Sequence, residues 1–428
     1  MNEEIAMRPT LRSWLESYKA IERDCLSGLV ARGVALAPFG SHMQEVRALK
    51  GALRARGICF LNGEASLSRG FLSDACRACV GGCGSRTFYI NLRCDRTCYF
   101  CFNPNQADYE KHRQSDAPWR VELEEFSRSC AHVTHIALTG GEPLLCKEKT
   151  YEFFSRAREL NPDAHLRLYT SGTSFDEACC DTLADCGLDE IRFSIKLDEG
   201  EESIAETLRR IGIAVPRIPD VMVEMPVVPG TTKRMEQLLA ELDARGVRGV
   251  NLLEFCFPLR NWSEFEQRGF KIKNPPFDVL YDYEYAGGLP VAGSEEACLS
   301  LLLYAEDVGL GLGVHYCSLE NKNRDQILCQ NRAGRLDAAV YELDANDWFY
   351  KTCKVFDGDV DPVRRHLEAR GCSFSLEEDG ACLAFHPSLR EDVVQQGALV
   401  ANSFNVIQER EGDTYVRELK LALSENQG

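Results

Sequence analysis

The sequence predicts an α/β fold in which six strand–helix units form a partial barrel, about three quarters of a full eightfold one. Across residues 87–257, apolar runs rich in β-branched and aromatic residues alternate with amphipathic segments of helical period. This alternation implies parallel strands, because each helix carries the chain back to the starting edge of the sheet. In such a barrel the active site forms at the carboxyl ends of the strands.

Each predicted strand and helix of the barrel has its own signal. The strands are short apolar runs bounded by turn residues, and they span residues 87–93, 133–139, 164–170, 189–196, 219–228 and 248–257. The helices repeat apolar residues at intervals of three and four, and they span residues 118–130, 148–160, 175–186, 200–213 and 232–246.

Four segments flank the predicted core at residues 86–258. Residues 1–75 are expected to be mainly helical, and residues 76–85 form a loop dense in cysteine and glycine. Residues 259–345 contain turns, one helix and a strand-like run, and they are expected to close the barrel. Residues 346–428 alternate strands and helices in a way that predicts a small α+β module, for which a ferredoxin-like arrangement is one option.

The composition is that of an ordinary globular protein with an acidic surface. The chain has 428 residues, 44% hydrophobic and 27% charged, which is enough for two or three domains. Its 66 Asp and Glu outnumber 49 Lys and Arg, and the net charge of −17 disfavours nucleic acids and anionic membranes as partners. No apolar run approaches the ~20 residues that a membrane span needs, so we expect a cytoplasmic protein with no membrane partner.

Cysteine use indicates metal binding. Of the 20 cysteines, six crowd between residues 76 and 101, which favours metal ligation in a reducing compartment over a ladder of disulfides. Cys94, Cys98 and Cys101 follow the first predicted strand directly, so a loop leaving that strand can wrap three thiolates around one centre. No suitable fourth cysteine follows at once, and an iron–sulfur cluster held this way keeps one iron open to an exogenous ligand.

A second motif, Thr139-Gly140-Gly141-Glu142-Pro143, follows the second predicted strand. Two glycines permit close approach of the backbone to a ligand, and the Glu142 carboxylate can accept from an ammonium group. Together with the CxxxCxxC spacing, this motif resembles the radical S-adenosylmethionine (radical SAM) superfamily over about residues 86–258. The resemblance implies a partial TIM barrel of the radical SAM type. It also implies a [4Fe–4S] cluster that cleaves S-adenosylmethionine reductively to a 5′-deoxyadenosyl radical, which takes a hydrogen atom from the substrate.

The resemblance further implies which residues meet the cofactors. Cys94, Cys98 and Cys101 would hold three irons, and S-adenosylmethionine would chelate the fourth. An aromatic residue before the third cysteine would lie against the adenine, and the polar ends of the third and fourth strands would meet the ribose and the carboxylate. For the strand-end positions, ordinary β/α turns are the alternative. The predicted cofactor-binding residues are Phe100, Gly140, Gly141, Glu142, Pro143, Ser171, Ser194, Lys196 and Val228.

A second metal centre is predicted just before the first strand. Cys76, Cys79 and Cys83 stand at a CxxCxxxC spacing among glycines that let the backbone fold closely around a metal. The centre would be a second iron–sulfur cluster or zinc, and Cys317 is the favoured fourth ligand. The alternative is a tight loop of reduced structural cysteines.

Substrate contacts are predicted on later strands. Glu224 and Glu254 interrupt apolar strands and would bind substrate or cofactor if they point into the barrel; an outward or pairing position is the alternative. The run from His315 to Lys322 is dense in reactive residue types, and both of these residues are further candidates. A single catalytic residue is not predicted, since the radical arises at the cluster.

The sequence therefore predicts a radical SAM enzyme with an auxiliary metal centre, acting on a small molecule or a peptide, with a flavodoxin or ferredoxin as electron donor. A glycyl-radical-activating or peptide-modifying role is an alternative within this class. The competing class is a non-catalytic iron–sulfur or zinc module, in which both cysteine groups are structural and the Gly-Gly-Glu-Pro loop is a coincidence.

Overall fold

The computed structural model describes two compact units. Its described residues are 8–81, 84–280, 287–410 and 413–423. The barrel unit contains the described residues of 35–275 and 286–322, and the C-terminal unit contains those of 1–34, 276–285 and 323–428. No helix in these ranges is both long enough and apolar enough to cross a membrane.

A nine-stranded sheet with the order β1-β2-β11-β8-β7-β6-β5-β4-β3 forms the barrel unit. Strands β3 to β8 run parallel in chain order, and β11 adds a further parallel strand beside β8. This sheet confirms the predicted partial barrel. The strands are β1 Cys59–Leu61, β2 Ser66–Arg69, β3 Ser85–Tyr89, β4 His135–Thr139, β5 His165–Thr170, β6 Glu190–Phe193, β7 Asp220–Val227, β8 Gly249–Glu254 and β11 Gly313–Cys317.

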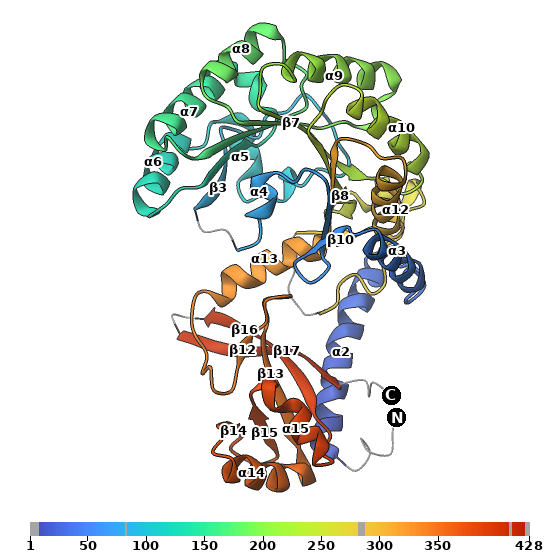
Figure 1. The fold of residues 1–428 in the computed structure, drawn as a ribbon, viewed down its shortest axis with the longest axis vertical. Coiled ribbons are helices and arrows are strands. Elements are labelled where there is room, and N and C mark those ends of the chain that lie inside the picture. Colours follow the sequence, from blue (N-terminus) through green and yellow to red (C-terminus); the bar gives the residue numbers. More distant parts are fainter. Residues whose placement is uncertain (1–7, 82–83, 281–286, 411–412, 424–428) are drawn as a thin grey trace. The chain divides into compact units, whose positions relative to one another are not determined.

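Helices cover the outer side of this sheet (Figure 1). The crossover helices are α6 Trp119–Ser129, α7 Lys147–Leu160, α8 Glu177–Asp185, α9 Glu201–Ala214, α10 Thr232–Asp243 and α12 Ser294–Asp307. The remaining elements of this unit are α3 Met43–Ala55, α4 Asp74–Arg77, α5 Tyr109–Gln114, α11 Trp262–Gln267, and the pair β9 Cys256–Phe257 and β10 Leu289–Pro290. Helix α13 Leu319–Asn331 begins in this unit and continues into the C-terminal unit after residue 322.

The strand–helix repeat continues further than the sequence predicts. The sequence predicts a barrel of six strands that ends at residue 258, with only a strand-like run beyond it, whereas β11 pairs in parallel with β8 as a seventh strand. The insertion that contains β9, α11 and β10 separates β8 from its crossover helix α12, and this interruption hides the last unit in the sequence. As a result His315 and Cys317 lie on a barrel strand and not in a loop.

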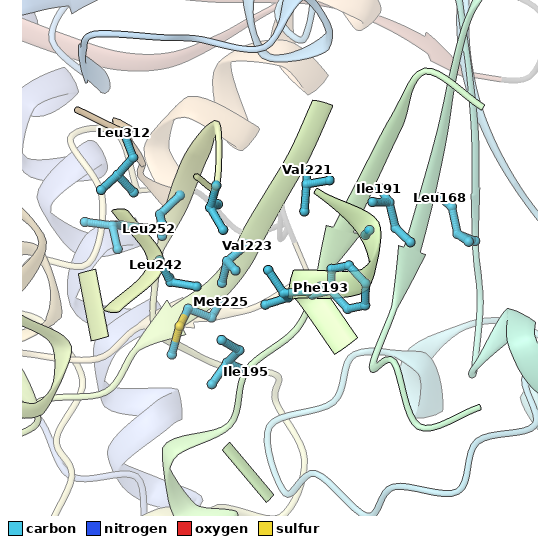
Figure 2. Packing of buried hydrophobic residues seen from close by; sticks show 14 of the residues in the cluster. Leu168, Ile191, Phe193, Ile195, Val221, Val223, Met225, Leu242, Leu252 and Leu312 are labelled. Carbon is cyan, nitrogen blue, oxygen red and sulfur yellow. The ribbon is translucent and has the colours of Figure 1, made fainter. Parts of the chain in front are cut away.

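Alternation along the strands separates an apolar face from a polar one. Leu168, Ile191, Phe193, Val223 and other buried side chains form the core on the helix-facing side (Figure 2). Intervening positions such as 167, 190, 192, 224 and 251 are polar and point to the opposite face, which is the barrel interior. The interior is therefore not filled by the layers of branched apolar residues that are usual in closed barrels.

Arg192 is the centre of a hydrogen-bonded network in this interior, and only 2% of it is exposed. It pairs with Glu190, and its Nη1 donates to Glu224 Oε2 at 2.5 Å. Its Nη2 donates to Ser73 Oγ at 3.1 Å and to Cys76 Sγ at 3.2 Å. Ser73 precedes helix α4, so this network anchors the cysteine-bearing segment to the strands.

The same network makes stability depend on acid pH through Glu190. Burial alone would raise the pKa of Glu190, but the hydrogen bond from His165 and the charge of Arg192 lower it from 4.5 to about 2. A lowered pKa stabilises the fold above pH 4.5, and this stabilisation is lost as the pH falls towards 2. Above pH 4.5 we expect the wild type to have a larger free energy of unfolding than Glu190→Gln. This difference should shrink by about 3 kcal/mol as the pH falls from 4.5 to 2.

Denaturant titrations between pH 2 and 7 measure this margin. Glu148→Gln, at an exposed carboxylate outside the network, serves as the control and should follow the wild-type profile. Parallel pH profiles of the wild type and Glu190→Gln would contradict the prediction.

An antiparallel sheet with the order β14-β15-β13-β16-β17 forms the C-terminal unit, and β12 pairs with β13. Helix α2, from the predicted N-terminal helical segment, belongs to this unit, where Trp14 packs edge-on against Phe356 with ring centroids 5.4 Å apart. The elements are α2 Pro9–Ala31, β12 Glu342–Leu343, β13 Tyr350–Phe356, α14 Val360–Ala369, β14 Phe374–Leu376, β15 Cys382–Phe385, α15 Arg390–Gln395, β16 Ala401–Arg410 and β17 Asp413–Leu423.

Candidate active site at the strand ends

A cavity of about 320 Å³ lies at the carboxyl ends of the barrel strands. Its wall combines thiols, aromatic rings, charged side chains and the glycine loop, which is the segment from Gly140 to Pro143. Such a mixture is typical of a ligand site. Most of the residues predicted for the site line it: Cys94, Cys98, Phe100, Cys101, Gly140, Gly141, Glu142, Ser171, Ser194, Lys196, Glu224, Glu254 and Lys322. The strands thus bring together residues that lie far apart in the sequence.

The three thiols sit on a loop that begins after β3. The Cys101 N–H donates to the Cys98 carbonyl at 3.1 Å, and the Arg96 N–H lies 3.4 Å from Cys94 Sγ. Burial raises the pKa of Cys94 and of Cys101, so the free thiols are protonated near neutral pH. Metal coordination deprotonates such thiols, and hence the three residues fit a metal cluster that supplies the compensating charge.

The glycine loop packs directly against the segment that leads to Cys94. A Cβ at Gly141 would come within 1.8 Å of the Arg93 carbonyl oxygen, and one at Gly140 within 2.6 Å of that of Asn91. The N–H of Glu142 donates to the Arg93 carbonyl at 2.7 Å. The motif predicts that both glycines allow close approach of a ligand, whereas in the structure the contact between these two loops already requires them.

Replacing Gly141 should therefore disturb the cluster loop, the segment from Cys94 to Cys101. We expect Gly141→Ala to lower the free energy of unfolding by on the order of 3 kcal/mol, because two backbones must move apart. Gly212→Ala is the control: Gly212 lies in α9, nothing would lie within 4 Å of its new Cβ, and alanine favours helix by about 1 kcal/mol. Denaturant titration measures both variants, and equal stabilities would contradict the prediction.

The Glu142 carboxylate mainly accepts hydrogen bonds from the protein itself. Only 2% of the residue is exposed, and its Oε1 accepts from the Leu144 N–H at 3.0 Å and from Thr170 Oγ1 at 2.6 Å. Its Oε2 accepts from the Ser171 N–H at 2.6 Å. The carboxylate thus ties the ends of β4 and β5 together at the cavity wall, so most of its capacity to accept from an ammonium group is already used.

Lys196 brings a cation to the cavity wall near the cluster loop. It is paired with Glu199 across 3.7 Å, and its charge opposes the raised pKa of Cys94 and of Cys101. Phe100 lines the same cavity and meets Phe255 edge-on at 5.6 Å between ring centroids. This end of the cavity therefore offers a cation, thiols and aromatic surface together.

Both strand carboxylates face the cavity, which resolves the two orientations that the sequence left open. Glu224 is paired with Arg192, and this charge outweighs the effect of burial and lowers the pKa of Glu224. Glu254 Oε1 accepts from Lys273 Nζ at 2.8 Å, and its Oε2 accepts from the Leu319 N–H at 2.8 Å. Each carboxylate thus already has a protein cation as its partner.

Lys322 brings a second cation to the cavity wall. It is the fourth residue of α13, and its ammonium lies 6.0 Å from the centroid of the Phe102 ring. In the ranges that the structure describes, Lys322 forms no hydrogen bond or ion pair with a carboxylate. The charges near it are those of Cys317, Cys256, Glu224 and Cys79, which outweigh burial and raise its pKa.

Three predicted residues do not belong to the cavity wall. Pro143 is buried at the start of the 3-10 turn that follows Glu142, and Val228 follows β7 without reaching the cavity. His315 points into the barrel interior, where its Nε2 lies 2.7 Å from Ser66 Oγ. Burial lowers the pKa of His315 to about 4, so it is neutral and unsuited to binding an anion.

Other lining residues carry no sequence motif. Asn103 Nδ2 donates to the Gly140 carbonyl at 2.6 Å, although the sequence indicates only a polar turn at this position. Tyr169 follows the inward alternation of β5, a signal that could have identified it. Cys256 lies in the insertion after β8 without metal-like spacing, and no sequence signal could have placed it here.

The described members of the second cysteine group differ in exposure. Cys317, at the end of β11, is buried, Cys76 is half-buried and accepts from Arg192, and Cys79 is exposed. Asn321 Nδ2 lies 3.6 Å from Cys317 Sγ. Cys83 lies outside the described residues, and within them no three His, Cys, Asp or Glu side chains are gathered closely enough for a single metal ion.

Comparisons with known proteins relate this chain to one superfamily and to two curated proteins. Residues 88–242 match the family described as the Radical SAM superfamily. A curated protein of Methanocaldococcus jannaschii, provisionally named a glycyl-radical enzyme activating enzyme, is 27% identical over 76% of this chain and 84% of its own length. PqqA peptide cyclase of Gluconobacter oxydans is 32% identical over 25% of this chain and 28% of its own length.

Solved structures show more distant likenesses. Tagged anSMEcpe with bound AdoMet is 14% identical, with a TM-score of 0.35 over 41% of this chain and 53% of that one. SuiB of Streptococcus suis bound to S-adenosylmethionine is 13% identical, with a TM-score of 0.34 over 58% of this chain and 53% of that one. The chain thus spans about half the length of these proteins.

Proposed function

We propose that the chain, whose residues 88–242 match the Radical SAM superfamily, is a radical SAM enzyme whose cavity cleaves S-adenosylmethionine and exposes a substrate to the resulting radical. The observation that carries the proposal is that three thiols and the glycine loop share one cavity wall. When bound there, a [4Fe–4S] cluster and S-adenosylmethionine supply reductive sulfonium cleavage and hydrogen-atom abstraction.

The chain's own residues provide the binding and the orientation. Cys94, Cys98 and Cys101 hold the cluster, and Lys196 places a positive charge beside them. Phe100 offers an aromatic face for the adenine, with Ser171 and Ser194 at the adjoining strand ends. The hydrogen bonds of Glu142 and Asn103 keep the glycine loop in place, so the donors and acceptors of the cavity are arranged before any ligand arrives.

A second metal centre, an iron–sulfur cluster or zinc, is part of the proposal. Its ligands are Cys76, Cys79 and Cys317, with Cys83 as the further cysteine of the trio. Support comes from the Arg192 hydrogen bond to Cys76, since donors to ligand sulfurs are usual around such centres, and from the buried position of Cys317 at the end of β11. Structural reduced cysteines are the alternative.

The proposed substrate is a peptide or protein segment. One relative, which matches 76% of this chain, is named for activating a glycyl-radical enzyme, and another, which matches 25%, for cyclising the PqqA peptide. Glu224, Glu254 and Lys322 are the proposed polar contacts for this segment, and an electron donor such as a flavodoxin or ferredoxin supplies the electron. A small-molecule substrate is the alternative, and deuterium transfer into 5′-deoxyadenosine from deuterated peptide or metabolite fractions separates the two.

Anaerobic reconstitution tests the proposed activity. Protein treated with iron and sulfide, then reduced with dithionite, should convert S-adenosylmethionine to 5′-deoxyadenosine and methionine, which liquid chromatography measures. A non-catalytic metal module would bind iron and form neither product. Absence of 5′-deoxyadenosine from a fully reconstituted sample would refute the enzyme mechanism proposed here.

A further inference from the structure

Three carboxylates line the cavity, those of Glu142, Glu224 and Glu254. Both oxygens of Glu142 and both of Glu254 accept hydrogen bonds from donors of the protein. Glu224 differs, because Arg192 Nη1, at 2.5 Å, and Asn251 Nδ2, at 2.7 Å, both donate to the same oxygen, Oε2. Within the described residues its Oε1 has no hydrogen-bond partner, although the side chain lines the cavity.

The two donors to Oε2 also set the direction of Oε1. Glu224 lies inside β7 and not at its carboxyl end, which places it below the strand ends, at the floor of the cavity. Arg192 is 2% exposed and Asn251 4%, so both donors are enclosed beneath this floor. The charge of Arg192 outweighs burial and lowers the pKa of Glu224, so Oε1 accepts and does not donate. It is therefore a pre-oriented acceptor at the floor of the cavity.

Tyr169 adds a second group to this floor. It lies beside Arg192 in the register of β5 and β6, and its ring centroid is 5.6 Å from the guanidinium carbon of that arginine. Tyr169 lines the cavity, and its hydroxyl has no hydrogen-bond partner among the described residues. Because a hydroxyl can donate or accept, the floor offers a fixed acceptor at Glu224 and an adaptable group at Tyr169.

The formal charges beneath the floor are already balanced. Arg192 is paired with Glu190 and Glu224. The guanidinium carbon of Arg167 lies 5.0 Å from the ring centroid of Tyr169. Two arginines thus accompany two carboxylates, so a cationic substrate group would add a positive charge without a further anion, and an anionic group would meet Glu224. A neutral hydrogen-bond donor carries neither cost.

We propose that Glu224 selects the substrate by accepting a hydrogen bond from a neutral donor, a carboxamide or hydroxyl side chain that reaches the floor of the cavity. This inference rests on the proposed function, in which the cavity receives a peptide segment, and it names the chemical class of the side chain that enters. Glu224 is then a specificity-determining contact, because a side chain without a donor leaves its Oε1 unpaired in a partly buried place.

Binding of four blocked tripeptides tests this selection. Acetyl-Gly-X-Gly-amide with Asn, Asp, Leu or Lys at position X presents a neutral donor, an anion, an apolar side chain of similar branching, and a cation. The full chain is reconstituted with iron and sulfide and kept with S-adenosylmethionine but without a reductant, and equilibrium dialysis measures each dissociation constant. We expect the Asn peptide to bind about 10-fold more tightly than the Leu and Lys peptides, and about 100-fold more tightly than the Asp peptide.

Glu224→Gln should reverse the order of the Asn and Asp peptides. Arg192 Nη1 and Asn251 Nδ2 both donate to one position, so the oxygen of the new amide must occupy it and the NH₂ group must turn into the cavity. The floor then offers a donor in place of an acceptor. We expect the Asp peptide to bind about 10-fold more tightly than the Asn peptide in this variant.

Glu190→Gln is the matched control. It removes the other carboxylate that is paired with Arg192, but Glu190 does not line the cavity. This variant should keep the wild-type order of the four peptides. The order is a ratio of affinities within one sample, so a partly unfolded variant still reports it, and the wild-type order tests the inference even if Glu224→Gln does not fold.

Each outcome supports or overturns the selection by Glu224. Equal affinities, no binding of any peptide, or tightest binding of the Lys or the Asp peptide by the wild type overturns it. A Glu224→Gln variant that binds S-adenosylmethionine more weakly and keeps the wild-type order also overturns it, and assigns Glu224 to the cofactor. The proposed enzyme activity is judged separately, by 5′-deoxyadenosine formation after reduction, so the two proposals can fail independently.

Discussion

Cys98→Ala should reduce the formation of 5′-deoxyadenosine to the level seen without protein. Cys98 is the middle of the three thiols that line the cavity, and the Cys101 N–H donates to its carbonyl, so the loop holds the thiols as one unit. Two thiolates cannot retain a four-iron cluster that needs three protein ligands and one open iron. The effect is therefore expected to be a loss of activity and not a graded decrease.

The measurement is anaerobic reconstitution followed by iron and sulfide analysis and product detection. Cys130→Ala is the control, because Cys130 is a half-buried cysteine at the end of α6 that does not line the cavity. It should retain both the cluster and the activity. Retained cleavage in Cys98→Ala would refute the assignment of the first cluster to these three cysteines.

Local patterns predicted most of the barrel, and non-local contacts account for what they missed. The six strands from β3 to β8 and the helices between them follow directly from apolar periodicity, because each unit is short and repeats. The seventh strand, β11, was missed because an insertion separates β8 from α12. Periodicity is read within a window and cannot bridge such an interruption.

The candidate site shows the same division. The first cluster loop and the glycine loop could be predicted because their residue types and spacing are set by ligand chemistry. The inward position of Glu224 could have been predicted from the sequence, because Arg192 and Tyr169 also interrupt apolar runs on the preceding strands. The place of Cys256 beside Lys322 could not, because it depends on how the insertion after β8 folds back.

The glycine loop shows how a correct motif can have an incomplete physical explanation. The motif predicts a cofactor loop, and Gly140 and Gly141 do line the cavity. Their lack of side chains is required first by the Asn91 and Arg93 carbonyls, which the sequence does not place near them. The motif therefore positions the cluster loop and the ligand surface at the same time.

Cys317→Ala should remove the metal that remains when the first cluster is disabled. In the variant with Cys94, Cys98 and Cys101 replaced by Ala, we expect metal to be retained by the second centre. Cys317 is buried at the end of β11 and lies within electrostatic range of Cys76 and Cys79. Losing one of three or four thiolates lowers the affinity of such a site steeply, so the metal content should fall towards zero after chelator treatment.

Cys298→Ala in the same background is the matched control. Cys298 is a fully buried thiol on α12 near Cys317, but its Sγ lies 4.0 Å from the Leu253 carbonyl oxygen within the helix-facing core. Its replacement should leave iron and zinc counts unchanged while costing a similar amount of packing. Equal metal contents in the Cys317 and Cys298 variants would exclude Cys317 as a ligand, and would leave the Cys76 loop to form any centre with a residue other than Cys317.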